Sequence, residues 1–522
     1  MSLPCDHLFT GLREAFPCPE GKSFFCRGKK LFPFSFGVLC YIEYERRTMK
    51  LQWRSENTYK LLPKELYSLV QASEISKPEL VVFNESLAES LGISIDLSDL
   101  ETAKLFSGNM LDEQWTPLAQ AYAGHQYGGF GILGDGRALL LTEILDPSGQ
   151  RFDVQLKGSG RTPYSRGGDG KAALGPMLRE YLISEAMAAL SIPTTRSLAV
   201  VKTNEPVIRE DKLPGAILTR VAKSHIRVGT FQWISQKGNP DLQRTFFEYV
   251  IDRHFPDLKD QTDAAKQMLQ RVIESQAHLI AKWQSVGFVH GVMNTDNMLV
   301  SGETIDYGPC AFMDHYNPQA VFSSIDQYGR YAYHNQPNAA LWNLTRFAET
   351  LLSLLDANPD NAVKVAEDAL ATFAPIYYQA YYQLMGQKIG IYAVTSEDYP
   401  LIDRLLALME THQADYTNTF LSLQQSLASP PWFLEDDVKE WNSLWLKRIS
   451  KEQEPYSLMK QVNPTVIPRN HIVDDALTKA QQGDMTLFHS LLQALRQPYS
   501  EGPQPFQTPG PFGERFVTYC GT

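Results

Sequence analysis

The run His290-Gly-Val-Met-Asn-Thr-Asp-Asn297, which is followed by Asp306, constrains this chain more than any other stretch. Between them, Met298–Val300 and Glu303–Ile305 flank a Ser-Gly pair, a pattern that predicts two short strands joined by a turn. Such a hairpin would bring the side chains of Asn297 and Asp306 to one open edge. An amide oxygen and a carboxylate are hard oxygen donors that suit Mg²⁺ bound to nucleotide phosphates. The stretch therefore predicts a metal and nucleotide site.

The same run follows the skeleton of the protein-kinase catalytic loop, H-x-D-x-x-x-x-N, which precedes a metal-binding Asp. Asn297 stands at the Asn position of that pattern, whereas Val292 stands where a kinase keeps its catalytic Asp. A different carboxylate, Asp296, directly precedes the Asn. The pattern predicts an ATP and metal site that lacks the base of ordinary phosphoryl transfer. The alternative is a buried hairpin in which Asn297 and Asp306 occur by chance.

A glycine-rich segment, Ala121–Arg137, lies far upstream and holds six glycines in 17 residues. Glycine permits positive φ and a close approach of backbone to a ligand. The segment can cradle phosphates with backbone N–H groups, or it can simply turn a β-hairpin at Asp135-Gly136. Its composition alone does not decide between the two.

The elements after this segment have the order found in a kinase small lobe. Strands are predicted over Ala138–Leu145 and Arg151–Lys157, followed by a polar loop and a helix over Lys171–Leu190. A Lys at the end of such a strand sits where a kinase keeps its phosphate-binding Lys. Glu180 on the helix is its expected ion-pair partner, and Glu185 is the second choice.

Two further strands, Thr195–Lys202 and Ala216–Val221, would complete a five-stranded lobe, while the segment from Met49 to Gly108 carries short helical patterns. Arg220 and Arg227 flank the predicted hinge. Their guanidinium groups can bind phosphate in a bidentate manner or form ordinary ion pairs, and the sequence favours neither.

The fold class we predict is α+β, a bilobal protein-kinase-like fold with a β-rich small lobe and a mostly helical large lobe that carries a C-terminal helical extension. We expect a small lobe over residues 49–222 and a large lobe over 223–522. Residues 1–48 differ in composition, and we expect a poorly ordered extension that adds no core. An unusual targeting segment is the alternative for residues 1–48.

Composition narrows the class of protein. The chain has 522 residues and a net charge of −11, which argues against a nucleic-acid binder. No apolar run reaches the roughly 18 residues of a membrane span. Four of six cysteines lie in the first 40 residues, and a core nearly free of Cys fits a reducing compartment. We therefore expect a cytoplasmic monomer with no membrane partner.

Several motifs together resemble one family, selenoprotein O, the YdiU family of kinase-like protein adenylyltransferases. The resemblance runs from about Met49 to Thr522. It is carried by Tyr122-Ala-Gly-His-Gln-Tyr-Gly128, Gly134-Asp-Gly-Arg137, Leu156-Lys-Gly-Ser-Gly160, Thr162-Pro-Tyr-Ser-Arg166, Asp169-Gly170, the His290–Asn297 run, Ile305-Asp-Tyr-Gly-Pro309 and the stretch from Asn463-Pro to Ile467-Pro-Arg-Asn-His471.

The resemblance implies transfer of a nucleoside monophosphate from ATP, or from UTP, to Ser, Thr or Tyr hydroxyls of protein substrates, with release of pyrophosphate. It implies that Asn297 and Asp306 hold Mg²⁺ or Mn²⁺ and that Asp296 accepts the proton. The remaining implied roles are a Lys157–Glu180 pair, nucleotide contacts by Gly134, Gly136, Arg137, Asp169 and Gly170, and phosphate contacts by Arg220 and Arg227.

Cysteine usage departs from the family. Some relatives pair a C-terminal selenocysteine or cysteine with a cysteine of the activation segment. Here the C-terminal position is Cys520, and the comparable segment, Val321–Asp326, holds no cysteine. Cys310 is the one remaining candidate partner outside the N-terminal extension, so a regulatory disulfide stays open.

Two other functions compete with nucleotidyl transfer. A kinase that moves the γ-phosphate to a protein or a small molecule is disfavoured by the apolar Val292. A non-catalytic pseudokinase that only binds nucleotide is disfavoured by Lys157, Glu180, Asn297 and Asp306, because a scaffold need not keep a full metal site.

Overall fold

The computed structural model describes residues 31–33, 39–41, 51–112, 115–424, 429–511 and 516–518. The chain forms two compact units, Met1–Lys50 and Leu51–Thr522. In the first, β1 (Leu31–Pro33) pairs antiparallel with β2 (Leu39–Tyr41). The prediction for residues 1–48 otherwise lies outside the described residues, and the lobe boundary near residue 222 stays a prediction.

The second unit is built around an antiparallel sheet, for which the described residues supply nine strands, ordered β5-β8-β11-β12-β15-β14-β6, with β4 on β11 and β13 on β15. The strands are β4 (Arg54–Glu56), β5 (Tyr67–Leu69), β6 (Glu79–Phe83), β8 (Leu118–Gln120), β11 (Ala138–Leu145), β12 (Arg151–Lys157), β13 (Ala172–Ala173), β14 (Arg196–Ile208) and β15 (Lys212–Ala222). Two smaller pairs are β3 (Leu51–Gln52) with β7 (Ser94–Ile95), and β9 (Ala123–Gln126) with β10 (Gly129–Ile132).

The prediction of five strands therefore underestimated the size of this sheet. The segment before Gly108, which the sequence suggested to be helical, also contributes β4, β5 and β6 to the sheet. Only α1 (Glu85–Ser90) and α2 (Asp99–Ser107) are α-helices there. The three strands are short and lie at the margins of the sheet, where pairing rather than a strong sequence pattern sets their conformation.

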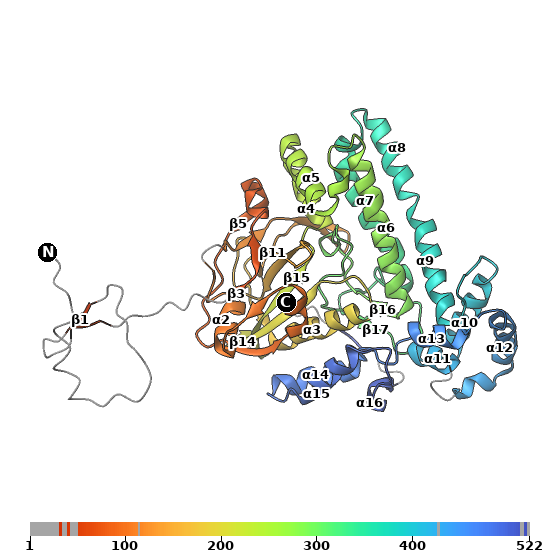
Figure 1. Cartoon of the computed structure of the whole chain (residues 1–522). Helices are drawn as coiled ribbons and strands as arrows, with labels where there is room; N and C mark the ends of the chain where they lie inside the picture. The colour runs from red at the N-terminus through yellow and green to blue at the C-terminus, as the bar shows by residue number, and fades with distance from the viewer. Residues whose placement is uncertain are drawn as a thin grey trace, which may run out of the picture. The chain divides into compact units, whose positions relative to one another are not determined.

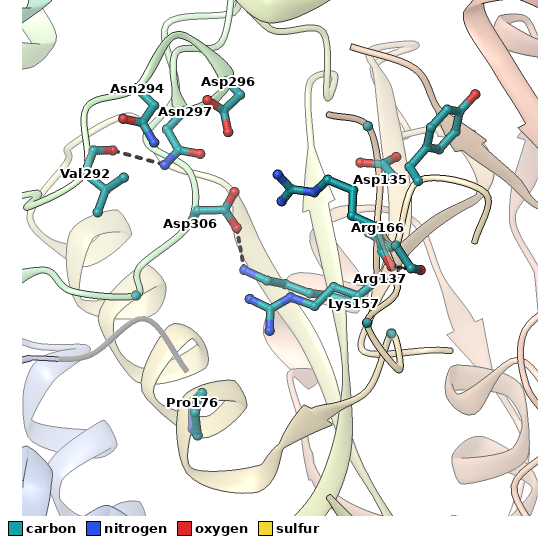
Figure 2. A pocket seen from close by; sticks show the side chains of 18 of the residues that line it. Asp135, Arg137, Lys157, Arg166, Pro176, Val292, Asn294, Asp296, Asn297 and Asp306 are labelled. Atoms are coloured by element: carbon teal, nitrogen blue, oxygen red, sulfur yellow. Dashed lines mark hydrogen bonds and ion pairs between the residues drawn. The ribbon is translucent and has the colours of Figure 1, made fainter. Parts of the chain in front are cut away.

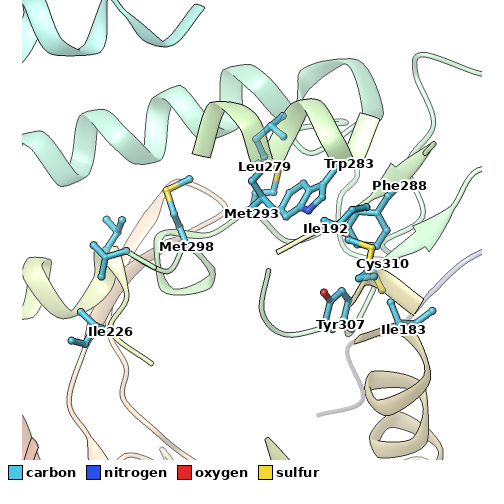
Figure 3. Close-up of a cluster of buried hydrophobic side chains, with 14 of the residues drawn as sticks. Ile183, Ile192, Ile226, Leu279, Trp283, Phe288, Met293, Met298, Tyr307 and Cys310 are labelled. Carbon is cyan, nitrogen blue, oxygen red and sulfur yellow. The ribbon is translucent and has the colours of Figure 1, made fainter. Parts of the chain in front are cut away.

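Helix α3 (Leu174–Ala189) packs on β14 and β15 and is covered in turn by α14 (Asn470–Gln481) and α15 (Thr486–Leu495). This two-sided packing explains why most of the helix is buried and shows little amphipathic alternation. The core under it continues into the helical part through residues such as Ile183, Trp283 and Phe288 (Figure 3). Helix α3 is thus fixed between the sheet and the C-terminal helices.

The rest of the chain is helical. Helix α6 (Ala264–Ser285) is its central element and packs against α7, α8 and α9 (Figure 1). The other helices are α4 (Val228–Lys237), α5 (Pro240–His254), α7 (Gln336–Leu355), α8 (Pro359–Leu370), α9 (Phe373–Lys388), α10 (Tyr399–Thr411), α11 (Tyr416–Leu423), α12 (Asp436–Ile449), α13 (Pro455–Val462) and α16 (Gln504–Gln507). Among the described residues, none of the helices is long and apolar enough to cross a lipid bilayer.

The predicted hairpin between Met298 and Ile305 is wrong. Leu299 pairs instead with Arg227, and Thr304 pairs with Thr194, each through an isolated bridge. The Ser-Gly turn forms, with the Gly302 N–H bonded to the Leu299 carbonyl, but the flanking residues satisfy their backbone groups against neighbouring segments. The segment therefore ties the loop after α6 to the β15–α4 connection.

The order of elements is that of a protein kinase: a sheet with a Lys at the end of a strand, a helix packed on that sheet, and a helical part whose loops follow β16 (Phe288–Val289). The predicted fold class, α+β and protein-kinase-like, is confirmed.

Candidate active site

A cavity of about 830 Å³ lies between the sheet, α3 and the loops after β16. Its lining includes all twelve residues that the sequence singled out: Gly134, Gly136, Arg137, Lys157, Asp169, Gly170, Glu180, Arg220, Arg227, Asp296, Asn297 and Asp306. Figure 2 shows the loop residues on one side of this space and Lys157 with the sheet residues on the other. Segments nearly 200 residues apart thus converge on one cavity.

Lys157 and Glu180 form the expected ion pair, with Lys157 Nζ 2.6 Å from Glu180 Oε2. The rival carboxylate, Glu185, is engaged elsewhere, because its two oxygens accept from the Arg196 guanidinium at 2.7 and 2.9 Å. Lys157 Nζ also contacts Asp306 Oδ1. One ammonium group therefore joins β12, α3 and the loop that carries Asp306.

Arg220 completes this cluster from β15. Its Nη1 lies 3.1 Å from Glu180 Oε1 and 2.8 Å from Asp306 Oδ1, and its Nη2 donates to Gln155 Oε1 at 2.6 Å. Only 2% of the Arg220 side chain is exposed. Of the two roles that the sequence left open for Arg220, the structure shows ion pairing. Arg220 thereby holds Glu180 and Asp306 in place.

The charges of this cluster keep Asp306 ionised. Burial by itself would raise the pKa of Asp306, but Lys157, Arg220 and Arg227 outweigh it and hold that pKa well below 3.8. The residue has a φ of +63°, which a non-glycine residue adopts only when its surroundings fix it. The second carboxylate oxygen points to the side of Asn297 (Figure 2).

On the loop side, the amide nitrogen of Asn297 donates to the Val292 carbonyl at 3.0 Å, which leaves its oxygen toward Asp306 (Figure 2). Asp296 Oδ2 accepts from Gln126 Nε2 at 3.1 Å, whereas its Oδ1 is buried without a hydrogen-bond partner in the part of the chain described. Burial raises the pKa of Asp296 to about 6, although the Gln126 hydrogen bond opposes that rise.

Arg227 approaches the cavity from the start of α4. Its guanidinium lies 4.4 Å from the centre of the Tyr122 ring and 3.6 Å from Asp135 Oδ1. Its Nε is buried without a hydrogen-bond partner among the residues that the structure describes. A buried guanidinium with an unused N–H is well suited to an anionic ligand.

The glycines of the Gly134-Asp-Gly136 motif are needed because the polar loop after β12 packs directly against them. A Cβ on Gly134 would lie 2.5 Å from the Tyr164 ring, and one on Gly136 would lie 2.9 Å from the Tyr164 carbonyl oxygen. Gly134 also has a φ of +116°. The motif therefore places two chain segments at backbone contact on one wall of the cavity.

Asp169 is bound by Arg209, whose Nη1 lies 2.9 Å from Asp169 Oδ2. The sequence analysis missed Arg209, which stands at the turn between β14 and β15, and did not assign the cavity-lining Arg161 and Lys171. The sequence marks Arg209 only as a basic residue at a hairpin tip, and such residues usually face water.

Positively charged side chains outnumber negatively charged ones in the cavity. Eight Lys or Arg and five Asp or Glu line it: Arg137, Lys157, Arg161, Arg166, Lys171, Arg209, Arg220 and Arg227 against Asp135, Asp169, Glu180, Asp296 and Asp306. This excess of cations, in a chain of net charge −11, favours a polyanionic ligand.

Cys310 is buried behind Asp306, and burial raises the pKa of its thiol to about 11. Cys520 lies outside the described residues, so the question of a disulfide between Cys310 and Cys520 stays as the sequence left it. Nearby, Thr518 Oγ1 donates to the Pro309 carbonyl at 2.7 Å, so the described end of the chain contacts the Asp306 loop.

Known proteins match this chain over most of its length. The family described as "Protein adenylyltransferase SelO" matches residues 48–496. Proteins named "Protein nucleotidyltransferase YdiU" are 52% identical over 480 residues in Bacillus cereus and 51% identical over 487 residues in Alkaliphilus metalliredigens. These alignments cover 90% and 91% of this chain, and 98% and 99% of the relatives.

Among solved structures, the chain aligns with ROP2 of Toxoplasma gondii, described as a virulence factor with a protein-kinase fold and no enzymatic activity. The TM-score is 0.23 and the identity 9%, over 64% of this chain and 87% of that chain. A score this low carries no argument about fold, which rests on the elements described above. The family match and the curated relatives are decisive: the chain belongs to the SelO family of protein adenylyltransferases.

Proposed function

We propose that this enzyme transfers AMP from ATP to hydroxyl groups of Ser, Thr or Tyr in protein substrates and releases pyrophosphate. UTP is the alternative donor. The observation that carries the proposal is the position of Asp296, a buried carboxylate that lines the same cavity as Asp306 and Asn297 and has only one of its oxygens hydrogen-bonded to another side chain. The kinase base position holds Val292, an apolar residue that takes no proton. The family membership and the names of the relatives agree with this reaction.

The donor set at the loop side fits Mg²⁺ or Mn²⁺. Asp306 offers an ionised carboxylate and Asn297 an amide oxygen, and both point toward one another. Among the described residues, no group of three His, Cys, Asp or Glu side chains is arranged to hold a metal ion. Two protein oxygens are what Mg²⁺ typically uses when phosphates and water complete its shell. The ion, when bound, would neutralise phosphate charge.

The cations of the cavity would bind the rest of the triphosphate. Arg227 has an unused, buried N–H, and Arg137, Arg161, Arg166 and Lys171 line the wall formed by the glycine motif and the polar loop. Lys157 and Arg220 are held by ion pairs with Glu180 and Asp306, so their positive charges would act on the phosphates from fixed positions. Charge held in place before the reaction is the main source of catalysis in this chemistry.

Asp296 would act as the general base. The substrate hydroxyl oxygen forms a bond to the α-phosphorus while the bond between that phosphorus and the bridging oxygen of the pyrophosphate breaks. The hydroxyl proton goes to an Asp296 carboxylate oxygen, and the electron pair of the broken bond leaves with pyrophosphate. A pKa of about 6 leaves Asp296 mostly ionised at pH 7 and close to the optimum for a base at that pH.

Incubation with α-labelled and, separately, γ-labelled ATP tests the proposal. Label on protein from the α-position alone is expected. Label from the γ-position alone would show a kinase, and label from neither would show a nucleotide-binding protein without transfer activity. Asp306→Asn, which keeps the side-chain volume, serves as the inactive control.

The proposal also covers the organisation and surroundings of the chain: a boundary between two lobes near residue 222, a monomer, a cytoplasmic location, and no nucleic-acid or membrane partner. Size-exclusion chromatography with light scattering on the full chain tests the oligomeric state.

A further inference from the structure

The hairpin of β9 and β10 is fixed to the catalytic loop by its inner strand. The His125 backbone N–H donates to Thr295 Oγ1 at 2.7 Å, and the Tyr127 N–H donates to Asn294 Oδ1 at 3.1 Å. Between them, Gln126 donates to Asp296. Strand β9 and the turn after it are thus bound to the proposed base and to the two residues that precede it.

The outer strand, β10, pairs only with β9 among the described residues, so its other edge presents unpaired backbone groups. Natural proteins usually block such edges with Lys, Pro or a covering segment. Here the strand reads Gly-Phe-Gly-Ile and has none of these residues. A Cβ on Gly129 or Gly131 would come no closer than 3.6 or 3.9 Å to a neighbouring segment or side chain, so the glycine face of the strand is loosely covered.

Exposed apolar side chains stand on and beside this edge. Phe130 is 44% and Ile132 is 62% exposed, and alternation along a strand puts both on one face. In the loop after Asp306, Ile325 is 54% and Tyr328 is 96% exposed, and Ile325 lines the cavity itself. We call the β10 edge with Phe130, Ile132, Ile325 and Tyr328 the β10 rim.

The two parts of the β10 rim are held together at the hairpin turn. The ring of Tyr127 packs on Tyr331 with 5.2 Å between centroids, and the hydroxyl of Tyr127 lies 3.4 Å from Ser323 Oγ. A Cβ on Gly128 would contact Arg330 at 3.8 Å. The hairpin turn therefore places the open edge beside the loop that carries Ile325 and Tyr328, and Tyr127 and Ile325 both line the cavity.

We propose that the β10 rim binds an extended, apolar segment of the protein substrate, adjacent to the residue whose hydroxyl enters the cavity. This inference rests on the proposed function, which requires a protein chain to reach Asp296 from outside. An added strand would satisfy the free backbone groups of β10, and alternate side chains would pack on Phe130 and Ile132. Backbone pairing is independent of sequence, so it would let one enzyme modify many proteins that share only an apolar, extended segment.

The test uses the full-length enzyme, α-labelled ATP and synthetic 15-residue peptides. One peptide set places Val or Ile at alternate positions around a central Ser, Thr or Tyr, and a matched set places Lys or Glu there. We expect a kcat/KM at least about tenfold higher for the apolar set. Methylation of backbone nitrogens on the strand-pairing side of an apolar peptide should remove this advantage.

The enzyme variants Phe130→Ser and Ile132→Lys change exposed side chains that do not touch the proposed reaction centre. Each should raise KM for the apolar peptides about tenfold and leave the Kd for ATP unchanged. Leu434→Lys is the matched control, because Leu434 is 72% exposed and does not line the cavity. It should leave both KM for the apolar peptides and the Kd for ATP unchanged.

Three outcomes would overturn the inference. Equal kcat/KM for apolar and charged peptides would show that the rim does not select apolar segments. Unchanged KM in both variants would show that the rim is not used. A dimer in light scattering that Ile132→Lys dissociates would show that a second copy covers the edge. If no peptide or protein accepts the α-label from wild-type enzyme, the proposed function itself fails, which is a separate result.

Discussion

The charged groups on the two sides of the cavity differ in how completely they are paired. On the sheet side, Lys157 and Arg220 lie 2.6 and 3.1 Å from the Glu180 carboxylate, and both also contact Asp306 of the facing loop. On the loop side, Asp296 is buried with one oxygen unpartnered. The sheet side is a network of ion pairs, whereas the loop side holds a buried carboxylate that is only partly hydrogen-bonded. In the proposed mechanism, the first side positions the phosphates and the second accepts the proton.

The largest loss should follow removal of the charge that joins the two sides. Asp306→Ala leaves Lys157 and Arg220 with Glu180 as the carboxylate they share and removes a proposed metal ligand. We expect a fall in α-label transfer of about 10³-fold or more. Full transfer by this variant would mean that any ion is held elsewhere, and circular dichroism would check that the fold survives.

Loss of the base should be nearly as severe but should spare binding. Asp296→Ala should lower kcat by about 10²–10⁴-fold while the Kd for ATP stays close to that of the wild type. Asn297→Ala should instead weaken Mn²⁺ binding, because it removes an oxygen ligand. Titration of Mn²⁺ against both variants separates the roles: equal losses of metal affinity would assign Asp296 to structure rather than to proton transfer.

A smaller loss should follow a change of geometry at constant charge. Arg220→Lys keeps the positive charge but cannot bridge Glu180, Asp306 and Gln155 at once. We expect a roughly 10-fold to 100-fold fall in kcat/KM. Lys479→Arg, at an exposed ion pair with Asp475 outside the cavity, is the control and should change little. Similar effects at both positions would contradict a special role for the ion-pair geometry of Arg220.

The smallest effect is on stability and its dependence on pH. Since burial raises the pKa of Asp296 to about 6, the folded state binds the proton more tightly than the unfolded state does. The contribution of Asp296 to the free energy of unfolding therefore falls as pH rises from about 4 to about 6. Asp296→Asn should be more stable than wild type by roughly 1–3 kcal/mol at pH 7.5, and the difference should vanish near pH 4. Urea denaturation at the two pH values measures it.

The raised pKa of Asp296 should also make the rate of transfer depend on pH. Transfer should decline below about pH 6, because the base becomes protonated. A wild-type activity profile that stays flat down to pH 5 would contradict either the base assignment or the burial of Asp296.

The sequence by itself determined the order of elements and the chemical character of the site. The loop skeleton with Asn297 and Asp306, the apolar residue at Val292, and a strand-end Lys157 followed by a helix are all local in the chain and can be read from spacing. The same reading chose Glu180 over Glu185 correctly, since the two stand more than one turn apart on one helix and face different neighbours.

Only the tertiary structure decided how these groups meet. Residues 298–305 find partners at Arg227 and Thr194 rather than in each other, because backbone groups pair with whatever segment packing brings near. The buried place of Arg220, the link between Arg209 and Asp169, and the free oxygen of Asp296 depend on contacts 40 to 170 residues apart in sequence. Burial and charge proximity are properties of the packed chain, so no local pattern encodes them.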